Sequence, residues 1–192
     1  MIVPSDEAFS MTMAALRRGT LVVIPTDTVY GLAARADDAD AMARLFALKG
    51  RDAAKSIAVL VGDLGQARRL TTHGLDRFAR FWPGPLTVVV PRAADAVLYI
   101  GDDDSTVGIR CPDDPFVRRL ALEVGPIAAS SANESGAPTP ATAREIAALF
   151  PSVSLVVDGG PRRGAASTVI DATVDPPTVL RPGALSATAL GI

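Results

Sequence analysis

Short apolar runs, each followed at once by polar residues, constrain the fold of this chain more than any other feature. Thr20–Ile24, Thr87–Val90 and Thr106–Arg110 are rich in β-branched residues, which is typical of short buried strands. Between such runs lie longer segments with apolar residues at helical spacing, among them Glu7–Arg18 and Asp40–Lys49. Strands that alternate with helices predict an α/β fold with a twisted, mixed sheet flanked by helices.

The expected elements follow one another without a repeat, a low-complexity linker or a break in composition. We therefore expect one domain, residues 1–192, which is long enough for a sizeable core. Helices are expected at Glu7–Arg18, Asp40–Lys49, Asp63–Leu70, Leu75–Phe81, Pro115–Glu123 and Thr142–Phe150, strands at Thr20–Ile24, Ser56–Val61, Thr87–Val90, Thr106–Arg110, Ile127–Ala129, Leu155–Val157, Thr168–Asp171 and Thr178–Leu180, an extended segment at Thr26–Tyr30, and loops at Gly101–Asp104, Ser130–Gly136 and Asp158–Ala166.

Composition narrows the cellular setting and the class of partner. The formal net charge of −2 gives no overall reason to expect a tightly bound polyanion, although a local basic cleft is compatible with it. Cys111 is the only cysteine, so the chain forms no intramolecular disulfide and a reducing compartment is favoured. We see no signal peptide and no apolar stretch of the roughly 20 residues that span a bilayer. The cytoplasm is the expected compartment.

Most familiar catalytic constellations are missing from the sequence. His73 is the sole histidine, which excludes multi-histidine metal sites, and its position in a turn indicates a solvent-facing or capping role. Cys111 follows a strand and precedes Pro112, so we expect a small packed side chain rather than a reactive thiol. Neither a P-loop motif nor a Rossmann glycine motif is present.

Cations at the edges of loops are the strongest chemical signal. Lys49, Arg51 and Lys55 cluster at a helix end and in the loop that follows it, where they could bind polyphosphate oxygens or simply form a solvated surface. Arg110 ends an apolar strand and is expected to point into a cleft, where a guanidinium suits a carboxylate.

The segment from Ser130 to Gly136 supplies compact hydrogen-bonding groups. Ser130, Ser131 and Asn133 could bind a ligand beside Gly136, where backbone can approach a ligand closely. The same residue types are equally typical of a helix N-cap or a turn. From the chemistry of the residues alone, both interpretations stay open.

Seven stretches, taken together, resemble the motifs of YrdC-type threonylcarbamoyl-AMP synthases. They are PTDTVYGL (25–32), KGR with Lys55 (49–55), WPGPLT (82–87), STVGIRCP (105–112), PIAASSANESGAPTP (126–140), STVID (167–171) and VLRPG (179–183). They occur in the family's order and run from about Gly19 to Gly183. Any one is weak, but the series is specific. The resemblance implies a YrdC-like domain around a central cavity, with its core at about residues 7–183. Because the chain stops soon after the last motif, we expect the short form without the extra C-terminal domain of longer relatives.

The resemblance also implies an activity. The family makes threonylcarbamoyl-AMP and pyrophosphate from L-threonine, bicarbonate or CO2, and ATP, which is a nucleotidyl transfer. The product is the precursor of N6-threonylcarbamoyladenosine in tRNA, and a partner transferase complex performs the transfer. Mg²⁺ is expected to arrive with ATP rather than in a protein metal site, and direct tRNA binding is expected to be weak.

Site residues are carried over only where the motifs match. The resemblance implies threonine contacts at Thr28, Arg110 and Ser167, nucleotide contacts at Lys49, Arg51, Lys55, Thr106, Ser131, Asn133, Thr139 and Arg181, and a catalytic role for Lys49 and Arg51 in holding the phosphates. The chain departs from the family pattern at Asp52, at Ser56-Ile57 and at Leu60, where longer relatives have a histidine. These departures bear on the threonine side of the pocket.

Two other functions remain open on the sequence alone. One is an RNA-binding module with a basic concave face, to which Arg68, Arg69, Arg162 and Arg163 would add charge. The acidic balance and the absence of aromatic stacking repeats argue against it. The other is a YrdC-like paralogue without this synthase activity, or a carbamoyl-transfer relative.

Overall fold

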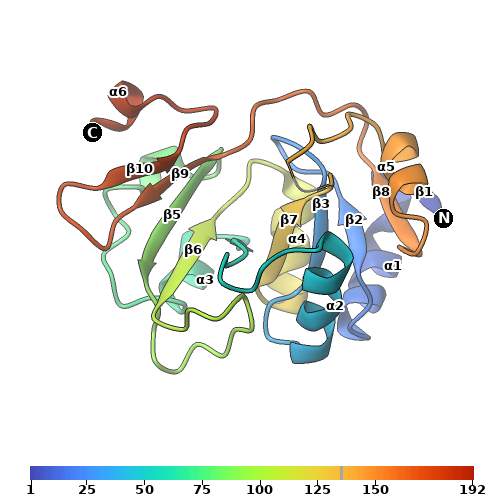
Figure 1. Ribbon diagram of the computed structural model, residues 1–192, viewed down its shortest axis with the longest axis horizontal. Coiled ribbons are helices and arrows are strands. Elements are labelled where there is room, and N and C mark those ends of the chain that lie inside the picture. Colours follow the sequence, from blue (N-terminus) through green and yellow to red (C-terminus); the bar gives the residue numbers. More distant parts are fainter. Residues whose placement is uncertain (135) are drawn as a thin grey trace.

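A computed structural model describes residues 1–134 and 136–192 (Figure 1). Within this part, ten strands form one sheet in the order β1-β8-β2-β3-β7-β4-β6-β5-β9-β10. The strands are β1 (Ile2–Pro4), β2 (Val22–Ile24), β3 (Gly31–Arg35), β4 (Val59–Leu60), β5 (Leu86–Pro91), β6 (Thr106–Arg110), β7 (Ile127–Ser131), β8 (Leu155–Asp158), β9 (Thr168–Asp171) and β10 (Thr178–Arg181). Four neighbouring pairs are parallel and five are antiparallel, which confirms the expected mixed sheet.

Every α-helix except the one at Ser5–Arg17 begins where the sequence supplies a capping side chain. Asp38, Asp63, Asp114 and Thr142 each accept a hydrogen bond from the backbone N–H three residues on, which satisfies a donor left free at the helix start. The helices are α1 (Ser5–Arg17), α2 (Ala39–Lys49), α3 (Leu64–Arg68), α4 (Pro115–Val124), α5 (Ala143–Leu149) and α6 (Ala187–Leu190), with a 3₁₀ turn at Ala79–Phe81.

Side chains of the buried strands alternate between two apolar clusters, one on each face of the sheet. On β2, Val22 and Ile24 enter the cluster that α1 and α4 cover, whereas Val23 enters the cluster that α2 and α5 cover. Figure 1 shows these four helices around β1, β2, β3, β7 and β8, while β5, β6, β9 and β10 form the other end of the molecule.

Two expected segments have a different structure. Thr26–Tyr30 is a turn rather than an extended segment, because the Thr26 hydroxyl accepts from the N–H groups of Thr28 and Val29 and donates to the Val29 carbonyl. Leu75–Phe81 is a series of turns rather than a helix, with only its last three residues in a 3₁₀ turn. Leu75, Phe78 and Phe81 recur every three residues, a spacing that three-residue turns align on one side.

Other differences concern the ends and neighbours of elements. The strand expected at Ser56–Val61 pairs only at Val59–Leu60, and β7 continues to Ser131, into the segment expected to be a loop. Three short elements were not anticipated, namely β1, β3 and α6. The expected strands Thr106–Arg110 and Thr168–Asp171 are confirmed at both ends.

Candidate functional site

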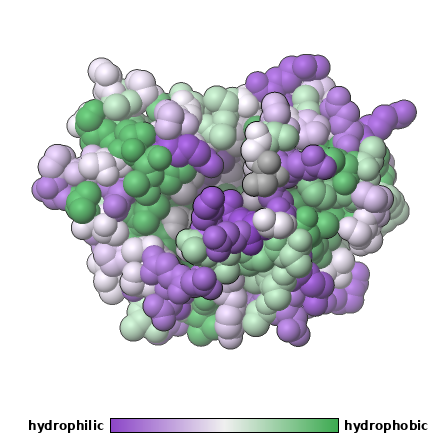
Figure 2. Space-filling view, viewed as in Figure 1, coloured by the Kyte–Doolittle hydropathy of each residue, from purple (hydrophilic) through white to green (hydrophobic). Residues whose placement is uncertain are grey.

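The candidate site lies on one face of the β5–β6–β9 half of the sheet, opposite the side chains of these strands that enter the larger apolar cluster. Thr87 of β5, and Gly108 and Arg110 of β6, share this face: the register pairs Val89 with Gly108, and side chains alternate along each strand. Gly108 has no side chain, so the surface of β6 is recessed between the side chains of Thr106 and Arg110. Figure 2 shows the surface hollowed between the two halves of the molecule, with hydrophilic residues beside the hollow.

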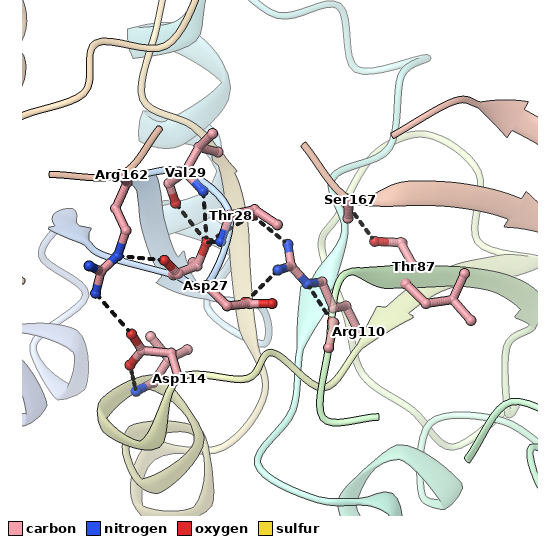
Figure 3. A network of polar contacts seen from close by, with 12 residues as sticks. Asp27, Thr28, Val29, Thr87, Arg110, Asp114, Arg162 and Ser167 are labelled. Carbon is pink, nitrogen blue, oxygen red and sulfur yellow. Dashed lines mark hydrogen bonds and ion pairs between the residues drawn. The ribbon is translucent and has the colours of Figure 1, made fainter. Parts of the chain in front are cut away.

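Arg110 is the most deeply buried cation of the site, with 6% of its surface exposed. Its guanidinium donates to the Gly84 carbonyl (3.1 Å), to the Thr28 hydroxyl (3.0 Å) and to the Asp27 carboxylate (2.5 Å) (Figure 3). Burial lowers the pKa of Arg110, and the adjacent Asp27 carboxylate opposes that shift. The turn at Thr26 aims Asp27 and Thr28 at the end of β6, because it reverses the chain directly after β2.

Ser167 and Arg181 complete the side of the site formed by β9 and β10. The Ser167 hydroxyl lies 2.9 Å from the Thr87 hydroxyl, and Arg181 donates to the Ser167 carbonyl (2.8 Å) and hydroxyl (3.1 Å). Gly183 allows the chain after Arg181 to press on this strand, since a Cβ there would lie 2.5 Å from the Ser167 carbonyl carbon. That close approach fixes Arg181 over Ser167.

Electrostatic effects link four cations of the site in three pairs, Lys49 with Arg51, Arg51 with Arg181, and Arg181 with Arg110. Burial lowers the pKa of Lys49, Arg51, Arg110 and Arg181, and neighbouring positive charge lowers it further for three of them: Arg51 acts on Lys49, and Arg181 acts on both Arg51 and Arg110. Only Arg110 has an ion-pair partner within the described residues. Converging cations that lack carboxylate partners form an electrostatic trap for a polyanion.

Lys49 and the segment after β7 form one unit. The Lys49 ammonium donates to the Ser131 carbonyl (2.9 Å), to the Asn133 side-chain oxygen (3.0 Å) and to the Asn133 carbonyl. The Ser131 hydroxyl in turn donates to the Asn133 side chain (2.6 Å). Lys49 thus binds Ser131 and Asn133, the two residues that the resemblance assigns to the nucleotide. These contacts are compatible both with a ligand-binding segment and with a turn at Ser130–Gly136.

The other three residues expected at the site are Lys55, Thr106 and Thr139, and within the described residues none of them hydrogen-bonds to Arg110, Ser167 or Arg181. The Lys55 side chain is exposed, and its carbonyl accepts from Arg51. Thr106 lies at the opposite end of β6 from Arg110 and donates to Asp103. Thr139 is half-buried and makes no side-chain hydrogen bond with another described residue. Ser135, inside the expected SSAN loop, lies outside the described residues.

Two positions where the chain departs from the family pattern have structural roles. The Asp52 carboxylate accepts from the Ala54 N–H and shapes the turn after Arg51. Leu60 is buried in the cluster beneath α4, and the β4–β6 register pairs it with Arg110. Cys111 is buried, and burial raises the pKa of its thiol, which confirms the expectation of a packed side chain. His73 is half-buried in a turn.

Sequence reasoning missed Asp27, Thr87 and Arg162 as parts of the site. Arg162 donates to the carbonyls of Thr26 and Gly159 (both 2.7 Å) and pairs with Asp114 at 3.4 Å, so it holds the turn from outside (Figure 3). The adjacent letters PTDT offered the signal for Asp27, whereas nothing local in the sequence indicated that Arg162 would cross to the same turn.

Comparison with known proteins decides the family. The Sua5/YciO/YrdC family model, described as "Telomere recombination", matches residues 14–183. The chain belongs to the Sua5/YciO/YrdC family. A protein of Mycobacterium tuberculosis strain H37Rv is 41% identical over 180 residues, which are 91% of this chain and 83% of the relative. The threonylcarbamoyl-AMP synthase of Bacillus subtilis is 38% identical over 95% of this chain and 55% of that protein.

Solved structures agree with the family and with the fold. P. abyssi Sua5 complexed with L-threonine superposes with a TM-score of 0.88 at 36% identity, covering 95% of this chain and 57% of that one. The chain therefore spans little more than half the length of these longer Sua5-type relatives. This family member has no helix long and apolar enough to cross a membrane among residues 1–134 and 136–192.

Proposed function

We propose that this chain is an L-threonylcarbamoyladenylate synthase, a nucleotidyltransferase that joins L-threonine, CO2 and the adenylate of ATP. The observation that carries the proposal is the row of cations Lys49, Arg51 and Arg181, which lack ion-pair partners in the described structure, beside the buried Arg110. Family membership and the relatives' activity support the same conclusion.

The threonine subsite is proposed at Arg110, Thr28 and Ser167. Arg110 uses three of the five N–H donors of a guanidinium on Gly84, Thr28 and Asp27. Two donors are left for a substrate carboxylate, and the hydroxyls of Thr28 and Ser167 lie within the same network of contacts as Arg110 and Thr87. P. abyssi Sua5, a relative, has been solved with L-threonine.

The nucleotide subsite is proposed at Arg51, Arg181 and the segment that Lys49 holds. The positive charges suit the triphosphate, while Ser131 and Asn133 supply small donors and acceptors near it. Lys55, Thr106 and Thr139 stay assigned to the nucleotide as part of this proposal.

The reaction follows from holding three reactants together. The threonine ammonium first loses a proton to solvent; the resulting amine adds to CO2, forming an N–C bond and releasing a second proton from nitrogen. The carbamate oxygen then attacks the α-phosphorus of ATP, and the bond to the bridging oxygen breaks so that pyrophosphate leaves with the electron pair. No paired carboxylates for general acid–base work were found in the motifs, so positioning and charge neutralisation are proposed to supply most of the rate enhancement.

Magnesium enters this account as part of the substrate. No three Asp, Glu, His or Cys side chains come together as metal ligands in the described part of the chain. We therefore propose that Mg²⁺ is bound by ATP phosphates, where it would neutralise charge on the departing pyrophosphate. Lys49, Arg51 and Arg181 would share that task from the protein side.

The contacts of the basic residues do not favour the RNA-binding alternative. Arg162 is half-buried and bound to two carbonyls and to Asp114, and Arg68 pairs with Asp76 at 2.5 Å. Fewer of the expected arginines are therefore free to line a basic surface. Omission of one substrate at a time from an assay of pyrophosphate release tests the proposed function: release should need both threonine and bicarbonate.

A further inference from the structure

We propose that Asp27 is a threonine-binding residue that accepts hydrogen bonds from the substrate's α-ammonium group. The inference rests on the proposed function and extends it, since Asp27 matches none of the contacts assigned from the motifs. It would make the buried Asp27–Arg110 pair a receptor for a zwitterion, in which each charge of the amino acid meets the opposite charge of the protein.

The position of Asp27 carries the first part of the argument. Its side chain is 13% exposed and that of Arg110 is 7% exposed, so the pair lies at the inner wall of the site. Thr28, the next residue, shares Arg110 as a partner through its hydroxyl (Figure 3). A threonine whose carboxylate reaches Arg110 would therefore have its α-carbon substituents within a few ångströms of Asp27.

The use of the Asp27 oxygens carries the second part. Oδ1 accepts from Arg110, whereas Oδ2 has no hydrogen-bond partner among residues 1–134 and 136–192. Because no fully buried side-chain oxygen of the described residues lacks a hydrogen-bond partner, Oδ2 must be at least partly accessible. The nearby acid Asp114 differs, because its two oxygens accept from the Val117 N–H and from Arg162. Asp27 thus has an accessible oxygen without a partner among the described residues, whereas both oxygens of Asp114 are used.

Charge balance carries the third part. A zwitterion placed beside an Arg–Asp pair leaves the site with no uncompensated charge, whereas a ligand with only a carboxylate leaves Asp27 without a new partner. The site should therefore discriminate against molecules that share threonine's carboxylate and hydroxyl but lack the ammonium. The competing interpretation is that Asp27 only holds Arg110 in place.

A binding experiment with two ligands separates these interpretations. Threonine and 3-hydroxybutanoate, in which a hydrogen replaces the ammonium, are titrated calorimetrically into the full chain, its Asp27→Asn variant and its Asp27→Glu variant. Asp76→Asn, which removes an exposed carboxylate with its own arginine partner, is the matched control. Binding of a non-hydrolysable ATP analogue to each variant shows that it is folded.

The expected result is a wild-type preference for threonine of about 10- to 100-fold, the effect of one hydrogen bond to a charged group. In Asp27→Asn the preference should fall to within about threefold, while Asp27→Glu and Asp76→Asn keep most of it. Equal weakening of both ligands in Asp27→Asn, or a wild-type protein that binds both alike, would overturn the proposal. A wild-type protein that binds the ATP analogue but no threonine would overturn the proposed function itself, and this inference with it.

Discussion

Removal of one partner of the buried Asp27–Arg110 pair should cost far more stability than removal of both. Arg110→Met leaves the Asp27 carboxylate without its partner at 13% exposure. Such a change typically destabilises a protein by about 3–5 kcal/mol, and because Oδ2 is partly accessible we expect the lower end, about 3 kcal/mol. For a chain of this size that corresponds to a fall in Tm of roughly 6–12 °C. The double variant Asp27→Asn/Arg110→Met should recover more than half of the lost free energy.

Urea denaturation of the wild type, both single variants and the double variant measures this coupling. Arg68→Met is the control, because its pair with Asp76 is 55% and 81% exposed, and exposed pairs contribute less than about 1 kcal/mol. A double variant as unstable as Arg110→Met would refute the reasoning, because the cost would then come from lost packing and hydrogen bonds rather than from an unpaired buried charge.

Two further predictions concern the division of the site into two subsites and the segment after β10 that holds Arg181 in place. Arg51→Ala should raise the KM for ATP at least tenfold with little change in the KM for threonine, and Arg110→Ala should do the reverse. Steady-state kinetics with each substrate varied in turn measure both constants. Equal effects of each variant on both substrates would count against two separate subsites. Gly183→Ala should lose about 1–3 kcal/mol of stability and most of the activity, because its Cβ would meet backbone and displace Arg181. Gly74→Ala is the control, because its Cβ would meet open space, and it should be near neutral. Urea denaturation and steady-state kinetics of both variants check this.

The local sequence pattern was enough to predict strands whose residues all have a high propensity for the same secondary structure. Thr106–Arg110 and Thr168–Asp171 are β-branched runs with clear boundaries, and they form strands at those positions. Gly31–Arg35 has two alanines and a glycine, so its composition does not indicate a strand; pairing with both β2 and β7 makes it one. At Leu75–Phe81, apolar spacing alone could not separate a helix from successive three-residue turns.

The candidate site was predictable as chemistry but not as geometry. The sequence indicated which cations and hydroxyls to consider, and the structure places Arg181 within electrostatic reach of both Arg51 and Arg110. The sequence could not indicate that Lys49 would bind the backbone of the SSAN segment, or that Asp27 would pair with Arg110 across 83 residues. Both contacts depend on long-range strand order, which no local motif encodes.

Threonine-dependent formation of an adenylate tests the central claim most directly. The full chain is incubated with ATP, Mg²⁺, threonine and ¹³C-bicarbonate, and pyrophosphate and the nucleotide products are followed together, with each substrate omitted in turn. The account predicts pyrophosphate release only in the complete mixture, with one ¹³C atom in a threonine-containing adenylate. Release that ignores threonine, or an adenylate without the label, would contradict it.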